Sequence, residues 1–159
     1  MTSLPVIQPP LRSAVPLDQL ARRMRLRGES ALRPLGLRPR HLVTLSVLQE
    51  QGEVTQQALA ASLQLDSTNV VGVLNELESD GLVTRRRDAN DRRRHIVELT
   101  EAGRERLAQA EFALAAVEDD VLRALDPDQR RQLAELLHVA AAGCLAADYA
   151  ATCLPPHES

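Results

Sequence analysis

The sequence predicts a mainly α-helical chain that carries one small β-hairpin. Apolar residues recur at helical spacing in six separate segments. Only one stretch, residues 82–99, holds two short runs with β-branched residues on either side of a polar connector, which is typical of a hairpin. A length of 159 residues is enough for one domain with a substantial buried core.

The first two predicted helices are bounded by proline and glycine. The first covers residues 17–32 and ends before Pro34; the second opens at Pro39, a favoured first-turn position, and stops at Gly52. Arginines crowd the other face of the first helix. The residues expected to face inward are Leu17, Leu20, Met24 and Ala31 in the first helix and Leu42, Leu45 and Leu48 in the second.

Two short helices follow, joined by a tight turn. Thr55 can cap the third helix, whose sequence is TQQALAASL, and Asp66 can cap the fourth, residues 67–79. Asp80-Gly81 closes the fourth helix because glycine adopts the left-handed conformation readily. The expected inward-facing residues are Ala58, Leu59 and Leu63 in the third helix and Val70, Val73, Leu74 and Leu77 in the fourth.

Residues 82–87 and 95–99 form the predicted hairpin, after which Thr100 caps a long fifth helix and Asp126-Pro127 opens a sixth. The apolar positions are Leu107, Ala110, Leu114, Val117, Val121 and Leu125 in the fifth helix and Leu133, Leu137, Ala140, Cys144 and Ala147 in the sixth. Two short helices and a hairpin in this order predict a winged helix-turn-helix domain, in which the second helix enters the major groove of DNA.

The predicted domain organisation follows from these elements. We expect a flexible arm over residues 1–14, where prolines are frequent, and a winged helix-turn-helix DNA-binding domain over 37–99. Residues 15–36 and 100–150 should form a helical dimerisation region, because their apolar faces exceed what a small winged domain can cover. Residues 151–159 are expected to form a loose tail.

The charges divide unevenly along the chain. All 19 basic residues are arginines; residues 1–97 hold 14 of them against 10 acidic residues, and residues 98–159 hold 5 against 12. A basic first part beneath a net charge of −3 indicates binding to a polyanion. The only aromatic residues, Phe112 and Tyr149, are too few to stack the bases of a single strand, so we expect double-stranded DNA.

The exposed side of the predicted helix 67–79 is polar and nearly uncharged. Asparagine can exchange two hydrogen bonds with adenine, and threonine offers a hydroxyl and a methyl group, so we expect Thr68, Asn69 and Asn75 to contact bases. Gly72 would let the backbone approach the duplex. The alternative is an ordinary amphipathic helix with a solvated polar face.

The hairpin has the composition of a DNA-binding wing. Residues 84–95 read TRRRDANDRRRH, and arginine side chains are long enough to enter a narrow minor groove or to contact phosphates. Asp91 is expected to orient a neighbouring arginine through a salt bridge. The alternative is a solvated charged loop. The DNA contacts expected from the hairpin and from the rest of this surface are Arg38, Thr55, Gln56, Arg85, Arg87, Asp91, Arg92, Arg93 and Arg94.

Residues 37–103 resemble the core of the MarR (multiple antibiotic resistance regulator) family. The segments LVTLSVL, TQQALAASLQLDSTNVVGVLNELESDGLV and RRRDANDRRRHIVELTEAGR carry the resemblance. Four motifs in fixed order make it specific: Leu-Asp-Ser-Thr at the start of the fourth helix, Leu-Glu-x-x-Gly-Leu-Val at its exit, Asp-Arg-Arg at the wing tip and Leu-Thr-x-x-Gly at the start of the fifth helix. With the flanking helices, the resemblance covers nearly the whole chain.

The resemblance implies a homodimer with interlocked terminal helices, two winged domains and an inverted-repeat operator. It implies that Ser67, Thr68 and Asn69 contact bases and phosphates, and that Asp91 and Arg93 form the wing-tip pair with Arg93 in the minor groove. Gly72 departs from the family, where a bulkier polar or basic side chain is expected. The function implied is that of a ligand-responsive repressor.

MarR-like regulators commonly respond to small phenolic or other anionic effectors, and Arg22, Met24, Arg25 and His41 are the candidate lining residues. For the two arginines, solvated charge or phosphate contact explains the sequence equally well, and His41 near a helix start is more often packed or capping. Cys144 is explained most simply as a small buried hydrophobe, and redox sensing is the less favoured alternative. Metal sensing is a second alternative, because Cys144 and Asp148 share a helix face, although no close spacing supplies four ligands. We expect no cofactor and assign no metal ligands.

Other classes of protein fit the sequence less well. The chain has no phosphate-binding glycine loop and no nucleophile motif, so we do not expect an enzyme. The longest uncharged, largely apolar stretch near the C-terminus, residues 139–147, is too short to cross a membrane, and we expect a cytoplasmic protein. The remaining alternative is a winged helix that binds protein, which predicts an apolar exposed stripe on the fourth helix or the wing.

Overall fold

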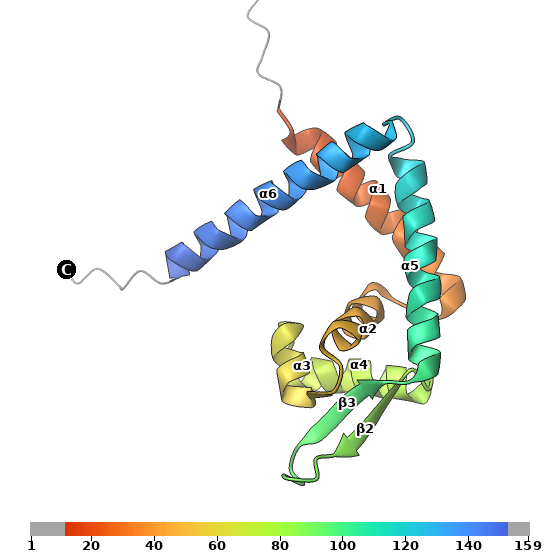
Figure 1. Ribbon diagram of the computed structural model, residues 1–159, viewed down its shortest axis with the longest axis vertical. Helices are drawn as coiled ribbons and strands as arrows, with labels where there is room; N and C mark the ends of the chain where they lie inside the picture. The colour runs from red at the N-terminus through yellow and green to blue at the C-terminus, as the bar shows by residue number, and fades with distance from the viewer. Residues whose placement is uncertain (1–11, 153–159) are drawn as a thin grey trace, which may run out of the picture. The chain divides into compact units, whose positions relative to one another are not determined.

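The computed structural model describes residues 12–152, with side chains described for residues 12–143, and is mainly helical with one small antiparallel sheet (Figure 1). The predicted fold class is confirmed. The elements are α1 (Ala14–Leu32), a 3-10 turn (Arg33–Leu35), α2 (Pro39–Gln51), β1 (Val54–Thr55), α3 (Gln56–Ser62), α4 (Ser67–Ser79), β2 (Val83–Arg87), β3 (His95–Leu99), α5 (Glu101–Val121) and α6 (Pro127–Thr152).

The chain divides between residues 118 and 119 into two compact units. Residues 1–11 and 153–159, which hold most of the predicted arm and tail and Cys153, lie outside the described residues, as does the side chain of Cys144. Helix α1 begins three residues earlier than predicted and includes Ala14 of the predicted arm; α6 extends to Thr152. None of the described helices is long and apolar enough to cross a membrane.

The core of the first unit lies where α2, α3 and α4 meet the sheet. Leu45, Leu59, Leu74 and Val97, one from each of these elements, are fully buried. The inward residues predicted for α4 are all buried. Because these apolar faces meet in one cluster, α4 is held with its opposite side exposed.

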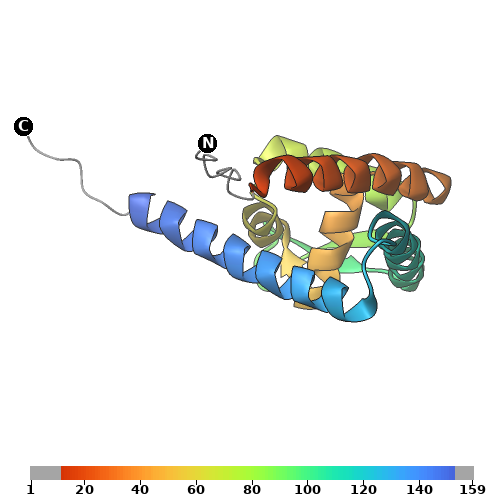
Figure 2. The ribbon, with the colours of Figure 1, turned by 90° about the horizontal axis from the view of Figure 1, so that it is seen from above.

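Helix α5 continues from the sheet and joins the same core through Leu107 and Ala110. Further along, Gly28 of α1 lies against Leu114 of α5, whose Cδ2 would be 3.2 Å from a Cβ at position 28. Figures 1 and 2 show α1 passing beside α5 at this level. The start of α1 is less buried than its end. Leu17, which was predicted to face inward, is 41% exposed.

The sheet has three strands in the order β1-β3-β2, whereas the sequence predicted only the two strands of the hairpin. Strand β1 is two residues long, with Val54 opposite Val97 and Thr55 opposite Ile96. So short a segment has no alternating pattern of its own, and only pairing with β3 makes it a strand. Thr55 also caps α3, as predicted: its Oγ1 accepts a hydrogen bond of 3.1 Å from Ala58 N.

The other predicted helix boundaries are confirmed by their side-chain caps. Asp66 Oδ1 accepts from Asn69 N at 2.8 Å, and Thr100 Oγ1 accepts from Gly103 N at 2.9 Å. Gly81, with φ of 70°, ends α4 in the left-handed conformation. These caps fix both ends of α4 and the point where the hairpin passes into α5.

The second unit consists of the end of α5 and α6. Asp126 Oδ1 accepts from Gln129 N at 2.9 Å and caps α6 as predicted. Arg130 donates to Asp119 Oδ1 at 2.5 Å across the turn. Leu125 lies four residues beyond the end of α5 at Val121, so the predicted pattern has one apolar position too many for this helix. The buried residue at the turn is Leu122.

Candidate nucleic-acid interface

The exposed side of α4 carries the polar residues that the sequence assigned to base contacts. Ser67, Thr68, Asn69, Gly72 and Asn75 are all exposed, opposite the buried side of the helix. A Cβ added at Gly72 would meet nothing within 4 Å, so the backbone there is open to a close neighbour. Helix α4 therefore presents an exposed polar surface whose backbone another molecule can approach closely at Gly72.

Asp66 orders the first turn of α4 beyond its capping bond. Its Oδ2 accepts a hydrogen bond of 2.7 Å from Nδ2 of Asn69. The backbone N–H of Asn69 is the largest cause that lowers the pKa of Asp66, and the side-chain bond adds to it. Asp66 is therefore a carboxylate at neutral pH, and the amide of Asn69 is fixed by it.

Arg85 of β2 points at α4 instead of at solvent. Its Nε donates to Glu78 Oε2 at 2.9 Å, its Nη2 also contacts Glu78, and Nη2 donates to Asn75 Oδ1 at 2.6 Å. The hydrogen bond from Arg85 is the main reason that the pKa of Glu78 lies below its ordinary value. The side chain of Arg85 is only 21% exposed. The sequence predicted a DNA contact for Arg85 and missed its internal partners.

A second carboxylate of α4, Glu76, binds the start of α2. It accepts from Arg40 Nη2 at 2.5 Å and from His41 Nε2 at 2.7 Å, and Arg38 Nη1 lies 3.6 Å away. These contacts lower the pKa of Glu76. The hydrogen bond from Arg40 is the largest cause, and the hydrogen bond from His41 is the second largest. Arg38, a predicted DNA contact, keeps 65% of its side chain exposed. Nothing in the sequence links residues so far apart.

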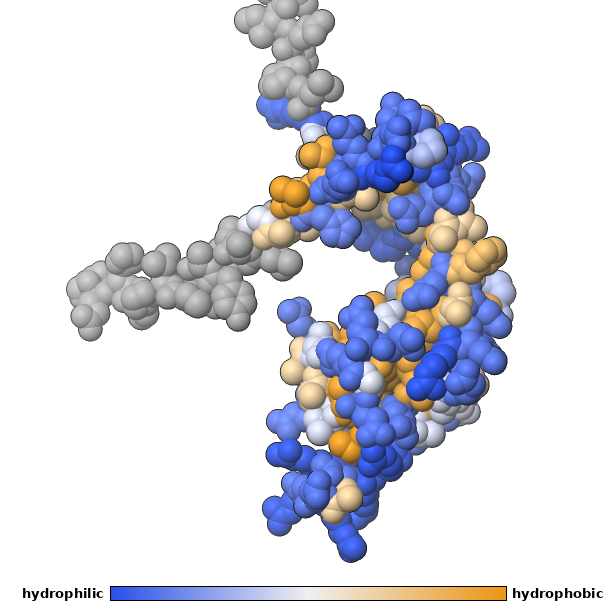
Figure 3. All heavy atoms as spheres, viewed as in Figure 1, coloured by the Kyte–Doolittle hydropathy of each residue, from blue (hydrophilic) through white to orange (hydrophobic). Residues whose placement is uncertain are grey.

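The wing tip is shaped by Asp91. Its Oδ1 accepts from Arg93 N at 3.0 Å, and its Oδ2 lies 3.4 Å from Arg94 Nε, which is the kind of salt bridge that the sequence predicted. Arg92, Arg93 and Arg94 are all exposed. Figure 3 shows hydrophilic side chains covering the end of the first unit where β2 and β3 lie. The tip thus turns consecutive arginines toward solvent.

The remaining predicted contacts lie around these elements. Arg87, at the end of β2, is exposed, and Gln56, the first residue of α3, is half-buried beside the capping residue Thr55. Strand pairing places Arg87 opposite His95 and Arg85 opposite the buried Val97. Alternation along β2 therefore distinguishes Arg85, on the face shared with Val97, from Arg86, on the other face.

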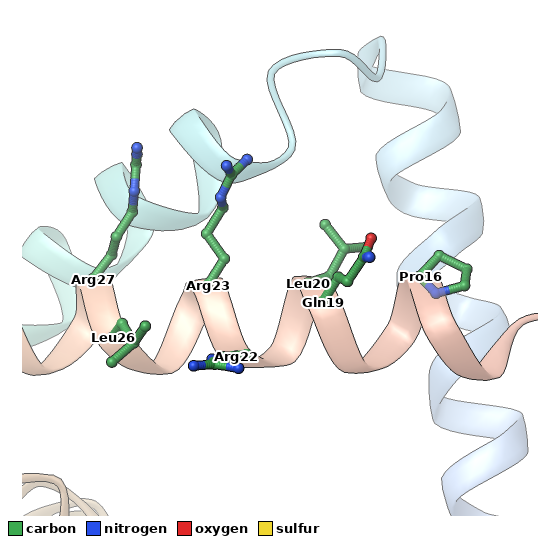
Figure 4. A pocket seen from close by; sticks show the side chains of 7 residues that line it. All are labelled: Pro16, Gln19, Leu20, Arg22, Arg23, Leu26 and Arg27. Atoms are coloured by element: carbon green, nitrogen blue, oxygen red, sulfur yellow. The ribbon is translucent and has the colours of Figure 1, made fainter.

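The residues predicted to bind an effector are not brought together. A hollow along α1 includes Arg22 but neither Met24 nor Arg25; its lining is Pro16, Gln19, Leu20, Arg22, Arg23, Leu26 and Arg27 (Figure 4). His41 is buried, and both of its ring nitrogens are occupied, Nδ1 by Arg38 N at 3.3 Å and Nε2 by Glu76. His41 thus has the packed and capping arrangement and offers no free nitrogen to an effector.

Comparison with known proteins identifies the family. The family model described as MarR family matches residues 37–95. A crystal structure of a transcriptional regulator (MarR family) from Rhodococcus sp. RHA1 is 30% identical, with a TM-score of 0.67 over 80% of this chain and 91% of that chain. The chain belongs to the MarR family. In this chain, α3 and α4 form the helix-turn-helix, and β2 and β3 form the wing.

Two further proteins are similar to this MarR-family chain. The uncharacterized HTH-type transcriptional regulator YdgJ of Bacillus subtilis is 32% identical over 102 residues, which are 64% of this chain and 62% of that protein, so the chain spans about three fifths of that relative's length. A MepR mutant of S. aureus, solved bound to an oligodeoxyribonucleotide, shares the fold with a TM-score of 0.62 at 22% identity over 84% of this chain and 99% of that chain. Membership of a family of transcription regulators agrees with the expectation that the chain is not an enzyme.

Proposed function

We propose that the chain is a sequence-specific, double-stranded-DNA-binding transcription regulator that acts in the cytoplasm as a homodimer on an inverted-repeat operator. One observation carries this proposal: the exposed, nearly uncharged side of α4 lies beside a wing whose tip turns Arg92, Arg93 and Arg94 to solvent. A helix of this kind fits the major groove, and arginines of this kind reach the adjacent minor groove. The oligonucleotide named in the MepR complex supports the same use of the fold.

Affinity for promoter DNA measured against salt concentration tests the proposal. We expect the affinity to fall steeply as salt rises, since each neutralised phosphate contributes a slope of about −0.9 on a log–log plot. Arg93→Ala should weaken binding and make the slope less steep by about 0.9, the contribution of one phosphate contact. Arg123→Ala is the matched control, because it removes an arginine that is 81% exposed and lies in the second unit. Equal binding by the Arg93→Ala variant and the wild type would remove the wing from the proposed interface.

The homodimer is proposed from apolar side chains that one subunit leaves exposed. Leu26 of α1 is 57% exposed, and Leu136 and Val139 of α6 are 63% and 73% exposed. Full burial of an exposed Leu or Val side chain stabilises by about 1.5–3 kcal/mol, and covering the exposed part of these three contributes a share of that, which favours pairing of these helices with a second copy. Two-fold symmetry would then present two copies of α4 about 34 Å apart, one turn of the duplex.

We further propose that the regulator is a repressor released by a small anionic or phenolic effector. The hollow along α1 supports this, because it combines the guanidinium groups of Arg22 and Arg23 with the apolar side chains of Leu20 and Leu26 (Figure 4). An effector that binds only one dimer geometry shifts the population toward it. Titration of the operator complex with a hydroxybenzoate, in the wild type and in Arg22→Ala, tests this: release of DNA that persists unchanged in the variant would exclude Arg22.

The alternative of a protein-binding winged helix finds no support on the exposed surface. It requires an apolar stripe on α4 or on the wing. Among the described residues, the exposed large hydrophobic side chains lie on α1, α2, α5 and α6. The surface of α4 and the wing therefore favours a polyanion over a protein partner.

A further inference from the structure

The two asparagines on the exposed side of α4 are bound to charged partners of opposite kinds. Asn69 donates from its amide nitrogen Nδ2 to the carboxylate of Asp66 at 2.7 Å. Asn75 accepts at its amide oxygen Oδ1 from the guanidinium of Arg85 at 2.6 Å. The two amides are therefore held by opposite ends.

The chemistry of the partners allows only these orientations. An ionised carboxylate accepts hydrogen bonds and a guanidinium only donates them, so neither amide can be reversed without losing its bond. Asp66 is itself held by capping α4, and Arg85 is held by Glu78 through Nε at 2.9 Å. Hydrogen bonds to charged groups are stronger than neutral ones, which makes both orientations robust.

Each amide leaves its other end for a ligand. Both asparagines are exposed, and within the described residues neither Oδ1 of Asn69 nor Nδ2 of Asn75 has a hydrogen-bond partner. The first end is an acceptor and the second is a donor. An asparagine that pairs with adenine in the two-bond manner must turn both ends of its amide toward the base.

We propose that α4 reads base edges through two asparagines of fixed and opposite polarity, an acceptor at Asn69 and a donor at Asn75, with Asp66 and Arg85 as positioning residues. This inference rests on the proposed function and adds its base specificity. Asn69 selects bases that present an amino group in the major groove, adenine or cytosine. Asn75 selects acceptor edges, above all guanine with its O6 and N7, and rejects cytosine.

Selection of bound sequences from a random duplex library tests the proposal at Asn75. Asn75→Asp keeps an oxygen for Arg85 but replaces the outward donor by an acceptor, so one base position in each half-site should change from guanine toward cytosine or adenine. Arg85→Met frees the amide, and the preference at that position, about tenfold in the wild type, should fall severalfold. Arg86→Met is the matched control. It removes the same charge from β2, but the side chain it removes pairs with Glu53 and not with a residue of α4.

Asp66→Ser tests the other asparagine. Serine is as good a helix cap as aspartate, so α4 should keep its stability, but the second oxygen that holds Nδ2 of Asn69 is lost. We expect the preference for adenine or cytosine at a second base position to weaken, while the position read by Asn75 stays unchanged. Circular dichroism and thermal unfolding of each variant verify that it keeps the helix content and stability of the wild type.

The outcomes separate this inference from the function on which it rests. If the folded variants bind DNA with the same base preferences as the wild type, the assignment of fixed polarity is overturned while DNA binding stands. If Arg86→Met changes the same position as Arg85→Met, positioning by Arg85 is overturned in favour of a general charge effect. If the wild type enriches no sequence at all, the proposed function fails, and the inference fails with it.

Discussion

Glu76 Oε2 accepts a hydrogen bond of 2.7 Å from Nε2 of His41, which joins α4 to the start of α2. Because Nδ1 of His41 accepts from Arg38 N, the proton of a neutral ring must lie on Nε2, where it is donated to the carboxylate. The histidine ring is 4% exposed. The same carboxylate also binds Arg40, so one side chain of α4 gathers three groups at the N-terminal end of α2.

This cluster predicts a pH-dependent contribution to stability. Its contacts hold the pKa of Glu76 below the ordinary glutamate value of 4.5, so the ionised side chain stabilises the fold above that pH, and this stabilisation is lost as the pH falls through the lowered pKa. We expect Glu76→Gln to reduce the free energy of unfolding at neutral pH. The difference from the wild type should shrink as the pH falls below about 4.5.

Urea denaturation followed from neutral to acid pH measures this difference. Glu105→Gln is the control, because it removes an exposed carboxylate of α5 and should leave the curve close to that of the wild type. A difference between Glu76→Gln and the wild type that stays constant across the pH range would show that the carboxylate charge is not what joins α2 to α4.

Gly103 and Gly72 predict opposite effects of the same substitution. A Cβ at Gly103 would lie 2.1 Å from the carbonyl oxygen of Leu82, which is itself fixed by a 3.1 Å hydrogen bond from Thr100 N. We expect Gly103→Ala to destabilise by about 1–3 kcal/mol, since overpacking outweighs the gain in helix propensity. Gly72→Ala meets nothing within 4 Å and should stabilise by about 0.5–1 kcal/mol.

Thermal unfolding of the two variants checks the pair. The stabilised Gly72→Ala variant also probes DNA binding, because its new methyl group lies on the exposed side of α4. Gly103→Ala that unfolds at the wild-type temperature would show that α5 can shift away from Leu82 at little cost.

Local sequence signals predicted most of the fold because the determinants lie within a few residues of one another. Asp66 bonds to Asn69 three residues on, and Thr100 bonds to Gly103, so capping residues mark the helix starts directly. The two-residue strand β1 could not be predicted, because only its pairing with β3 defines it.

The sequence placed the surface residues of the candidate site and the local salt bridge of Asp91, but not the bonds between distant segments. Composition and periodicity place Asn75 on the exposed side of α4 and Arg85 in the wing, and both placements hold. The bond between them depends on the angle at which β2 crosses α4, which no pattern within either segment encodes. The same holds for His41 and Glu76, which are 35 positions apart.

The proposed dimer predicts that exposed apolar residues of α6 control the oligomeric state. Leu136 and Val139 are 63% and 73% exposed in one subunit. We expect Leu136→Ser with Val139→Ser to raise the dimer dissociation constant by at least about tenfold, since the loss occurs twice in a symmetric pair. Sedimentation velocity measures this, with Val43→Ser on α2, 52% exposed, as the control. A double variant that remains as dimeric as the control would exclude this part of α6 from the interface.

Asp91 distinguishes a wing held in shape from a wing that acts by charge alone. If charge alone governs binding, Asp91→Ala removes a negative group from the wing tip and should tighten DNA binding. The bonds from Asp91 to Arg93 N and Arg94 Nε argue the reverse, because without them the tip must be ordered at the moment of binding. We therefore expect Asp91→Ala to bind operator several-fold more weakly than the wild type, and Asp91→Asn, whose amide oxygen can still accept from Arg93 N, to lie between them. Fluorescence anisotropy at fixed salt ranks the three proteins, and tighter binding by Asp91→Ala would show that the wing needs no ordering by this residue.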